Sequence, residues 1–393
     1  MKPGYKQTDV GVIPEEWEVK RLGECATFRT GPFGSTLHKS DYTQNGVPVI
    51  NPMHINDGRI EPTFSMTITE IAATALSMFR LTSGEIVMGR RGDMGRCAVV
   101  QPHQAGWLCG TGSIIIRLGN TDASFLQRVL SSPRAIRAIE ESSVGTTMVN
   151  LNHSTLAGLK LQIPPLPEQR AIAEALSDVD ALLGALDRLI AKKRDLKQAA
   201  MQQLLTGQTR LPGFHGEWAV KRLGEIAHIK TGSRNNEDKV EDGQYPFFVR
   251  SEVVEHINSY SHDCEAILVP GEGRIGSIFH YIHGRFDVHQ RVYAITQFKP
   301  DISGRFIHFY LSKNFGAWAM QNTVKATVDS LRLPTFLTFE MRLPPTKDEQ
   351  TAIAGVLGEM DAELAGLEQR RKKTRALKQA MMQELLTGRT RLI

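Results

Sequence analysis

The sequence has little cysteine and no long apolar run, and both shortages narrow the class of protein. Its four cysteines, Cys25, Cys97, Cys109 and Cys264, include no pair at C-x-x-C spacing. The absence of such a pair argues against a zinc site or a disulfide framework, and it favours reduced thiols in a cytoplasmic protein. No apolar stretch approaches the roughly 20 residues that span a membrane, and the first residues lack the apolar core of a signal peptide. We therefore expect a cytoplasmic chain with no membrane partner.

Motifs for catalysis are missing as well. The chain has no G-x-x-x-x-G-K-[ST] loop for ATP and no H-E-x-x-H motif. His280 and His283 have the spacing of two metal ligands, but they fall in a strand-like stretch without a third ligand. Asn51–His54 faintly resembles an adenine-methylase motif, yet no glycine-rich cofactor loop precedes it, so we interpret it as a turn. We expect no catalytic residue, no metal site and no cofactor bound by this chain, which is not an enzyme by itself.

Composition leaves room for more than one domain. The 393 residues are 41% hydrophobic and 23% charged, as in ordinary globular proteins, and each half is long enough to bury its own core. The net charge is +5 and the sequence pI is about 9.0. A mild positive balance of this kind indicates nucleic acid only where the charge is clustered.

What the chain does contain is a duplication. Residues 168–211 and 349–392 align at a constant offset of 181 without a gap, with 25 identities in 44 positions. A second repeat precedes each of these stretches: residues 17–31 match residues 218–232 at 10 of 15 positions. The order is head, helix, head, helix. A duplicated chain can fold with an approximate two-fold axis, and such a protein suits a target in two parts.

The duplicated stretches have the spacing of long helices with an apolar seam. Apolar residues alternate at intervals of four and three, which is the a/d pattern of a coiled coil. Gly207 and Gly388 follow as C′ glycines, and about 40 residues correspond to roughly 60 Å of helix. The nearest partner of each helix is its repeat, so we expect an antiparallel pair. The predicted interface residues are Ile172, Leu176, Val179, Leu183, Leu186, Ile353, Leu357, Met360, Leu364 and Leu367.

The heads have the pattern of strands and turns. Short apolar runs such as Val47–Ile50, Ser113–Leu118 and Val292–Thr296 are interrupted by Gly, Pro, Asn and Asp. Each head then ends in a helical pattern, at Ser124–Ile139 and Arg305–Met320. The predicted fold class is α+β: two mainly β domains with a few helices, separated by two long antiparallel helices that form a pseudo-two-fold coiled coil. The predicted boundaries are 1–160, 161–211, 212–342 and 343–393.

Arginine and glycine occur together in loops that suit nucleic acid. Head one has Gly89–Arg96 after a predicted strand, and head two has Gly271–Gly276 at the same offset of 181. Glycine allows a backbone to approach phosphate, and arginine can bond a guanine edge twice. A solvated surface turn is the alternative interpretation of each loop, but the recurrence favours function. We predict DNA contacts from these two loops, from the loop that follows each duplicated opening, and from residues 290–291. The predicted residues are Gly31, Phe33, Ser35, Arg90, Arg91, Asp93, Arg96, Arg234, Asn235, Asn236, Arg274, Gln290 and Arg291.

Several segments together resemble a known family. The helix beginning IPPLPEQRAIA (163–173), its weaker copy LPPTKDEQTAIA (343–354), the helix ends MQQLLTGQTRL and MQELLTGRTRL, and the opening WEVKRLGE are similar to those of DNA-specificity subunits of Type I restriction–modification systems. GTTMVNLN (145–152) also resembles a threonine–asparagine segment of that family, which adds Thr146, Thr147 and Asn150. Head two departs from this pattern at 326–331, where Thr327 is the counterpart with a weaker basis.

The resemblance implies a division of labour. Each head would be a target-recognition domain for one half of a split, asymmetric DNA site, and the helices would set the spacing between the halves. The partners would be double-stranded DNA, two methylation subunits and two restriction subunits. S-adenosylmethionine, ATP and Mg²⁺ would bind to those subunits and not to this chain.

Three alternatives remain open from the residues. The chain could be a stand-alone DNA-binding protein of similar fold, or the specificity subunit of a related system with fused nuclease–methylase partners. A coiled-coil scaffold that binds only protein is the third, and the divergence of the heads argues against it.

Overall fold

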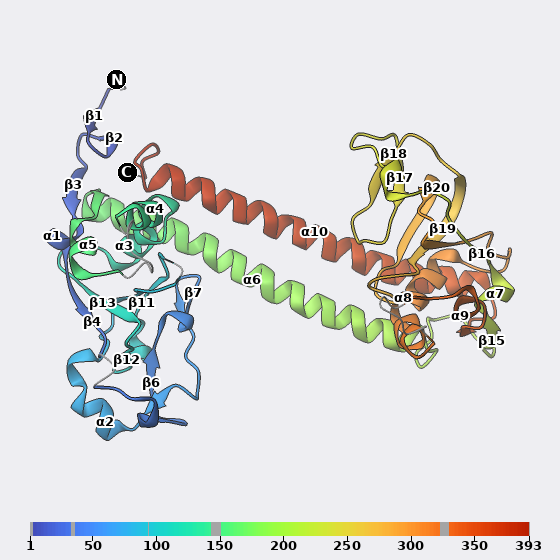
Figure 1. Cartoon of the computed structure of the whole chain (residues 1–393), viewed down its shortest axis with the longest axis horizontal. Coiled ribbons are helices and arrows are strands. Elements are labelled where there is room, and N and C mark those ends of the chain that lie inside the picture. Colours follow the sequence, from blue (N-terminus) through green and yellow to red (C-terminus); the bar gives the residue numbers. More distant parts are fainter. Residues whose placement is uncertain (1–2, 33–35, 93, 143–150, 323–329, 393) are drawn as a thin grey trace. The chain divides into compact units, whose positions relative to one another are not determined.

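The computed structural model describes residues 3–32, 36–92, 94–142, 151–322 and 330–392 (Figure 1). The chain divides into two compact units. Unit 1 comprises Met1–Ala185 with Arg371–Ile393, and unit 2 comprises Leu186–Arg370. Each unit therefore contains one head and one half of each long helix. The domain boundaries predicted from the sequence remain a prediction, since the compact units divide both helices.

The long helices are α6 (Leu166–Leu204) and α10 (Lys347–Leu385), each of 39 residues, close to the predicted length. Both are followed by a glycine with positive φ, Gly207 (72°) and Gly388 (70°), as predicted for C′ residues. Within unit 2, Arg194 pairs with Glu368, and Lys197, one turn later, pairs with Asp361, seven residues earlier. The two helices are therefore antiparallel there, as predicted.

The apolar seam of the two helices is buried most completely at the beginning of each helix and at Leu186, in the middle of α6. Ile172, Leu176 and Leu186 on α6 are buried, as are Ile353 and Leu357 on α10. The remaining predicted seam residues are half-buried, namely Val179, Leu183, Met360, Leu364 and Leu367. In unit 1 the beginning of α6 shares a core with Leu385 and Leu386 at the end of α10, which again makes the pair antiparallel.

Head one is built on two four-stranded sheets. The first has the order β11-β10-β13-β4 and the second the order β12-β6-β9-β5. The strands are β4 (Ala26–Thr30), β5 (Tyr42–Thr43), β6 (Val47–Ile50), β9 (Thr67–Ile68), β10 (Ile86–Gly89), β11 (Cys97–Val99), β12 (Leu108–Cys109) and β13 (Ser113–Leu118). The helices are α1 (Leu22–Cys25), α2 (Glu70–Ala75), α3 (Ala123–Leu130), α4 (Pro133–Glu141) and α5 (His153–Gly158). Smaller pairs join β1 (Tyr5–Thr8) to β2 (Gly11–Pro14), β3 (Glu18–Arg21) to β14 (Lys160–Ile163), and β7 (Ile55–Asn56) to β8 (Arg59–Ile60).

Head two is built on one six-stranded sheet of order β16-β21-β19-β20-β17-β18. The strands are β16 (His228–Thr231), β17 (Tyr245–Phe248), β18 (Glu255–Ile257), β19 (His262–Pro270), β20 (His280–Val288) and β21 (Val292–Thr296). The helices are α7 (Leu223–Ile226), α8 (Gly304–Gln321) and α9 (Leu333–Leu337), and β15 (Ala219–Arg222) pairs with β22 (Glu340–Leu343). Both heads are thus mixed, mainly β domains with a few helices, as predicted.

Short 3-10 turns complete the heads. They are η1 (Lys39–Asp41), η2 (Pro52–His54), η3 (Ser77–Phe79), η4 (Pro102–Gln104) and η5 (Asn236–Asp238). The segment Asn51–His54 is therefore a turn, as interpreted from the sequence, with Asn51 at its N-cap.

One predicted helix is wrong in its extent. The pattern Ser124–Ile139 predicts a single helix, but α3 ends at Leu130 and α4 begins at Pro133. Ser132 caps α4, its side chain accepting from the backbone N–H of Ala135, and Pro133 occupies the first turn where a missing N–H costs nothing. In head two the corresponding pattern does form one continuous helix, α8.

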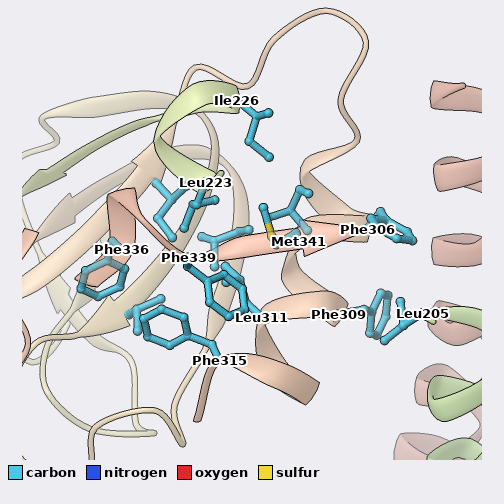
Figure 2. Close-up of a cluster of buried hydrophobic side chains, with 14 of the residues drawn as sticks. Leu205, Leu223, Ile226, Phe306, Phe309, Leu311, Phe315, Phe336, Phe339 and Met341 are labelled. Carbon is cyan, nitrogen blue, oxygen red and sulfur yellow. The ribbon is translucent and has the colours of Figure 1, made fainter. Parts of the chain in front are cut away.

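The core of unit 2 joins its head to the helix ends. Phe315 stacks on Phe336 at 5.0 Å between ring centroids and meets Phe339 edge-on at 5.1 Å. Leu205, just beyond the end of α6, belongs to the same cluster (Figure 2). Aromatic burial of this kind contributes strongly to stability, so the head is fixed to the helix end that it contacts.

Each unit also contains a fully buried glutamate at the beginning of a long helix. Glu349 accepts two hydrogen bonds from Arg210, at 2.8 and 2.6 Å, and Glu168 accepts from Arg391 at 2.5 Å. The two pairs are related by the offset of 181. Each arginine lies just past the end of the other long helix, so each pair fastens one helix's end to the other's beginning within its unit. In unit 1 the Trp17 indole N–H donates to Glu168 as well, at 2.9 Å.

Removal of one of these arginines should destabilise the fold. We expect Arg210→Ala to cost about 3 kcal/mol in the free energy of unfolding, because the buried Glu349 carboxylate is left unpaired. Arg222→Ala is the matched control in the same unit. Its pair with Glu340, at 3.4 Å, has both side chains more than half exposed, so we expect a loss of about 0–1 kcal/mol. Urea unfolding of the two variants measures the difference, and equal losses would contradict a structural role for Arg210.

Candidate nucleic-acid interface

In head one, main-chain hydrogen bonds bring three separate loops together. Gly31, after β4, donates to the carbonyl of Ser113 at 3.0 Å. Arg90, after β10, donates to the carbonyl of Gly112 at 2.9 Å, and its own carbonyl accepts from Leu151. Gly31 has no room for a side chain, since a Cβ would lie 2.0 Å from the Gly110 carbonyl oxygen. The predicted residues Gly31 and Arg90 therefore lie at the same end of the sheet.

The two neighbouring arginines of this loop differ in exposure. Arg90 is only 9% exposed, and burial lowers the pKa of its guanidinium, with a further contribution from Arg91. Arg91 is exposed, and Arg96 donates to the side chain of Asn56 at 3.2 Å. Of this pair, Arg91 is therefore the side chain that an approaching ligand meets first, while Arg90 is held inside the loop.

The loop of head two has the same construction. Gly271, after β19, donates to the carbonyl of Arg291 at 2.9 Å and accepts from Leu331 at 2.8 Å, as Arg90 does with its partners. Gly92 and Gly95 in head one have φ of 79° and 82°, and Gly273 and Gly276 in head two have 85° and 68°. A left-handed backbone at both positions favours glycine. The offset of 181 is thus also a structural equivalence, and it sets Glu272 where head one has Arg91.

Glu272 holds two arginines that come from other loops. Arg250 lies at 3.3 Å and Arg291 at 3.1 Å from its carboxylate, and both arginines are exposed. Arg274, in the same loop, pairs with Glu252 at 3.0 Å. Arg250 and Glu272 were not among the residues predicted from the sequence. The sequence contains a signal for Glu272, which aligns with Arg91 at the offset of 181. It contains none for Arg250, because Arg250 contacts Glu272 from a distant loop.

Arg234 and Asn235 join this cluster through the turn after β20. Arg234 forms an isolated bridge with His289, and its carbonyl accepts from the main chain of Gln290 at 2.8 Å. The Gln290 side chain in turn donates to Asn235. The predicted residues Arg234, Asn235, Gln290, Arg291 and Arg274 are therefore brought to one side of head two, and Asn236 begins the adjoining turn η5.

A buried carboxylate organises that turn. Asp287 is fully buried and accepts hydrogen bonds from Ser261 (2.7 Å), Ser259 (2.9 Å) and Arg234 (3.2 Å). Burial by itself would raise the pKa of Asp287, but these donors and the Val288 main chain outweigh it and hold the pKa below its usual value. Arg234 is thus tied to the protein on one side, which positions the loop that carries Asn235.

The exposed side chains of head two suit base edges. Asn235 and Gln290 offer amide donors and acceptors, and Arg250, Arg274 and Arg291 offer guanidinium donors. Amides pair with adenine and arginine with guanine in the major groove. Seven other residues predicted to bind DNA lie outside the described residues: Phe33, Ser35, Asp93, Thr146, Thr147, Asn150 and Thr327. DNA binding by every predicted residue, described or not, stays a prediction.

Other chemistry finds little support in the described part of the chain. Among residues 3–32, 36–92, 94–142, 151–322 and 330–392, no group of three His, Cys, Asp or Glu side chains could hold a metal ion. Burial raises the pKa of the Cys97 thiol to about 12, which removes its nucleophilic character near neutral pH. None of the helices in the described ranges is both long and apolar enough to span a membrane.

Comparison with known proteins identifies the family. The sequence model of the Type I restriction modification DNA specificity domain matches residues 14–192 and again residues 215–375. The chain belongs to this family. It is a specificity subunit of a type I restriction–modification system, the component that recognises DNA sequence, and it is not the catalytic component of that system.

Individual relatives agree with this assignment. The MjaX specificity subunit of a type I restriction enzyme from Methanocaldococcus jannaschii is 24% identical, with 99% of this chain and 97% of that protein covered. The EcoDI specificity subunit from Escherichia coli is 31% identical over 44% of this chain and 38% of its own length. The fold is that of the type I S subunit from M. genitalium, whose crystal structure matches with a TM-score of 0.67, at 18% identity and with 98% and 99% of the two chains covered.

The Asp287 network generates a prediction for the specificity subunit. We expect Asp287→Asn to destabilise head two by about 1–3 kcal/mol, because three donors lose a charged acceptor. The pKa of Asp287 in the folded chain is below the ordinary value of about 3.9, so its contribution is present above that pH and is lost as the pH falls through the lowered value. The difference between wild type and variant should therefore shrink below about pH 4.

Thermal unfolding between pH 3 and 7 measures this effect. Asp263→Asn is the control, since Asp263 forms an exposed pair with Arg285 at 3.0 Å on the same sheet, and its loss should cost no more than about 1 kcal/mol. A difference between wild type and Asp287→Asn that does not change with pH would count against the network.

Proposed function

We propose that each head of this specificity subunit reads one half of a bipartite, asymmetric DNA site. The observation that carries the proposal is the pair of equivalent loops after β10 and β19, which have the same main-chain bonding but opposite charge at one position, Arg91 and Glu272. A shared frame with different exposed side chains is what two readers of different sequences require. A protein-only scaffold would have no use for such a difference at equivalent exposed loops.

The two loops would read their half-sites differently. Arg91 stands exposed at its loop tip and can offer two parallel donors to a guanine edge. In head two the carboxylate at this position instead fixes Arg250 and Arg291. A guanidinium held by a carboxylate loses less conformational entropy when it meets DNA, which makes its contact more selective. Asn235 and Gln290, bonded to each other, add an amide pair beside them.

The helices would supply the spacing between half-sites and the surfaces for partners. Lys197 pairs with Asp361, and Lys378 with Asp180, so the repeat-related segments 197–199 and 378–380 present the same surface in each unit. Leu182, Leu189 and Leu196 recur every seven residues along α6, and they are 40%, 39% and 46% exposed. An exposed apolar stripe on a helix supports contact with another protein.

On this basis we propose an assembly with two methylation subunits, one for each repeated surface, which two restriction subunits can join in the cytoplasm. S-adenosylmethionine, ATP and Mg²⁺ would bind to those partners. A complex from a related system with fused nuclease–methylase partners would use the same heads, and the mass of the co-expressed assembly distinguishes the two. A stand-alone DNA-binding protein would instead bind its site tightly without any partner.

The arginines held by Glu272 provide the test of the reading mechanism. We expect Arg250→Ala, in the complex with its methylation subunits, to lose about 1–3 kcal/mol of discrimination at one base of one half-site and to leave the other half-site unchanged. Methylation of a library of randomised sites measures both halves at once. Arg285→Ala is the control, because Arg285 is exposed in the same head but pairs with Asp263 and covers Tyr260.

The pattern of the loss separates base reading from simpler contacts. Weakening that is equal for all sequences, with a salt dependence lower by about one unit, would make Arg250 a phosphate contact. Relaxation in both half-sites would show that the heads are not independent readers. Methylation by the specificity subunit alone would overturn the proposed division of labour.

A further inference from the structure

Unit 1 has an apolar groove of about 490 Å³ away from the loops described above. One wall is the end of α10, with Gln379, Met382 and Gln383, together with Leu386 and Thr387 just beyond it. The head forms the rest of the lining, with Val129 on α3, residues within 132–138 at the beginning of α4, Leu159, and Leu161 and Gln162 on β14. Its volume is at the lower end of the range of small ligand pockets and is large enough for an aromatic side chain.

The internal repeat shows what each wall corresponds to in unit 2. The α10 wall is the same in both copies, since its five residues correspond to Gln198, Met201, Gln202, Leu205 and Thr206 at the offset of 181. The head wall can be aligned through hydrogen bonds. Asp122 and Ser303 cap α3 and α8, and their main-chain N–H groups donate to Gln169 and Gln350, which are repeat-related. Seven residues after each cap stand Val129 and Tyr310.

The strand of the head wall aligns in the same way. Gln162 lies opposite Val19 in one strand pair, and Arg342 lies opposite Val220 in the other. Because Val19 and Val220 are equivalent in the duplicated opening, Gln162 corresponds to Arg342. By the same count, Leu159 in the groove corresponds to Phe339 in unit 2.

In unit 2 an aromatic ring of the chain itself stands at the position of Val129 and lies against the equivalent strand. The Tyr310 hydroxyl accepts a hydrogen bond from the main-chain N–H of Arg342 at 3.2 Å. Its ring lies 6.2 Å from those of Phe306 and Phe339. In unit 1 Val129 takes the place of Tyr310, and Leu159 takes the place of Phe339. The wall formed by the end of the long helix has the same residues in both units. The groove in unit 1 therefore includes the place at which unit 2 carries the Tyr310 ring.

The rim of the groove is positively charged. Arg134, Arg137 and Lys160 line it and are exposed. Arg134 donates to the carbonyl of Val10 and Arg137 to that of Pro133. Both acceptors are neutral, and neither arginine forms an ion pair with a carboxylate of the described residues. Lys160 pairs with Asp9. An occupant that carries carboxylates beside its aromatic group would complement this rim.

We propose that the groove receives a tyrosine or phenylalanine side chain, flanked by carboxylates, from a methylation subunit. This inference rests on the proposed assembly, and it adds a contact that the repeat does not duplicate. The groove begins at Gln379, inside the repeated helix surface assigned above to that partner, so occupant and helix contact form one continuous surface. Since only unit 1 lacks its own ring, one methylation subunit gains this anchor and the other does not.

The test is to fill the groove with a side chain of the specificity subunit itself. Val129→Tyr gives unit 1 the residue that unit 2 already carries at this position, where its hydroxyl can accept from the N–H of Gln162. We expect the variant to fold normally, with an unchanged melting temperature, and the full chain to bind its purified methylation subunit at least about tenfold more weakly. Tyr310→Val is the matched control, because it leaves the groove in unit 1 untouched and should retain that affinity.

A second variant does not depend on how the core accepts a tyrosine. Arg137→Glu changes only the exposed rim, and it should weaken binding of the methylation subunit and reduce the salt dependence of the affinity. Unchanged affinity in both Val129→Tyr and Arg137→Glu would overturn this inference and leave the proposed assembly intact. A wild-type chain that fails to bind the methylation subunit would overturn the assembly, and this inference with it.

Discussion

The structure depends on two buried carboxylates, Glu168 and Glu349, each at the beginning of a long helix. A buried charge without a partner is expensive, so each glutamate requires the arginine that follows the end of the other helix. Arg210 and Arg391 lie far from these glutamates in the sequence, and the pairs form only when the helices are antiparallel and in register. The same pairs therefore select the fold and hold a head to two helix ends within each unit.

Away from these two ion pairs, the exposed side chains of the two heads differ. The N-caps Asp122 and Ser303, the glutamines that they contact, and the glycines of the two arginine–glycine loops keep the main chain alike. The exposed side chains on that frame carry the differences, most clearly the change from Arg91 to Glu272. Head two then recruits Arg250 and Arg291 around the new carboxylate. Sequence recognition can diverge in this way without disturbing the packing on which folding depends.

Features decided by residues close together in the sequence could be predicted, and features that join distant segments could not. The heptad spacing and Gly207 and Gly388 sufficed for the long helices, because a helix and its C-cap are decided within a few turns. The break between α3 and α4 was missed although Ser132 and Pro133 mark it, because the apolar pattern continues across them. The contact between Arg250 and Glu272 could not be predicted, since it joins loops whose proximity is decided by the sheet. The resemblance to type I specificity subunits, now confirmed, named the function but not these contacts.

Because the chain is duplicated, each position of one copy can be compared with the equivalent position of the other. Leu205 and Leu386 are the same residue in both copies, and each is buried in the core of its unit. Where the copies differ on an otherwise identical frame, the difference marks what one unit does and the other does not. Tyr310 and Val129 occupy equivalent positions, and the Tyr310 hydroxyl bonds the equivalent strand, whereas Val129 lines an open groove. An overpacked or empty core is unfavourable in either copy, so a space left open in one copy is better understood as a surface completed by another protein than as a defect.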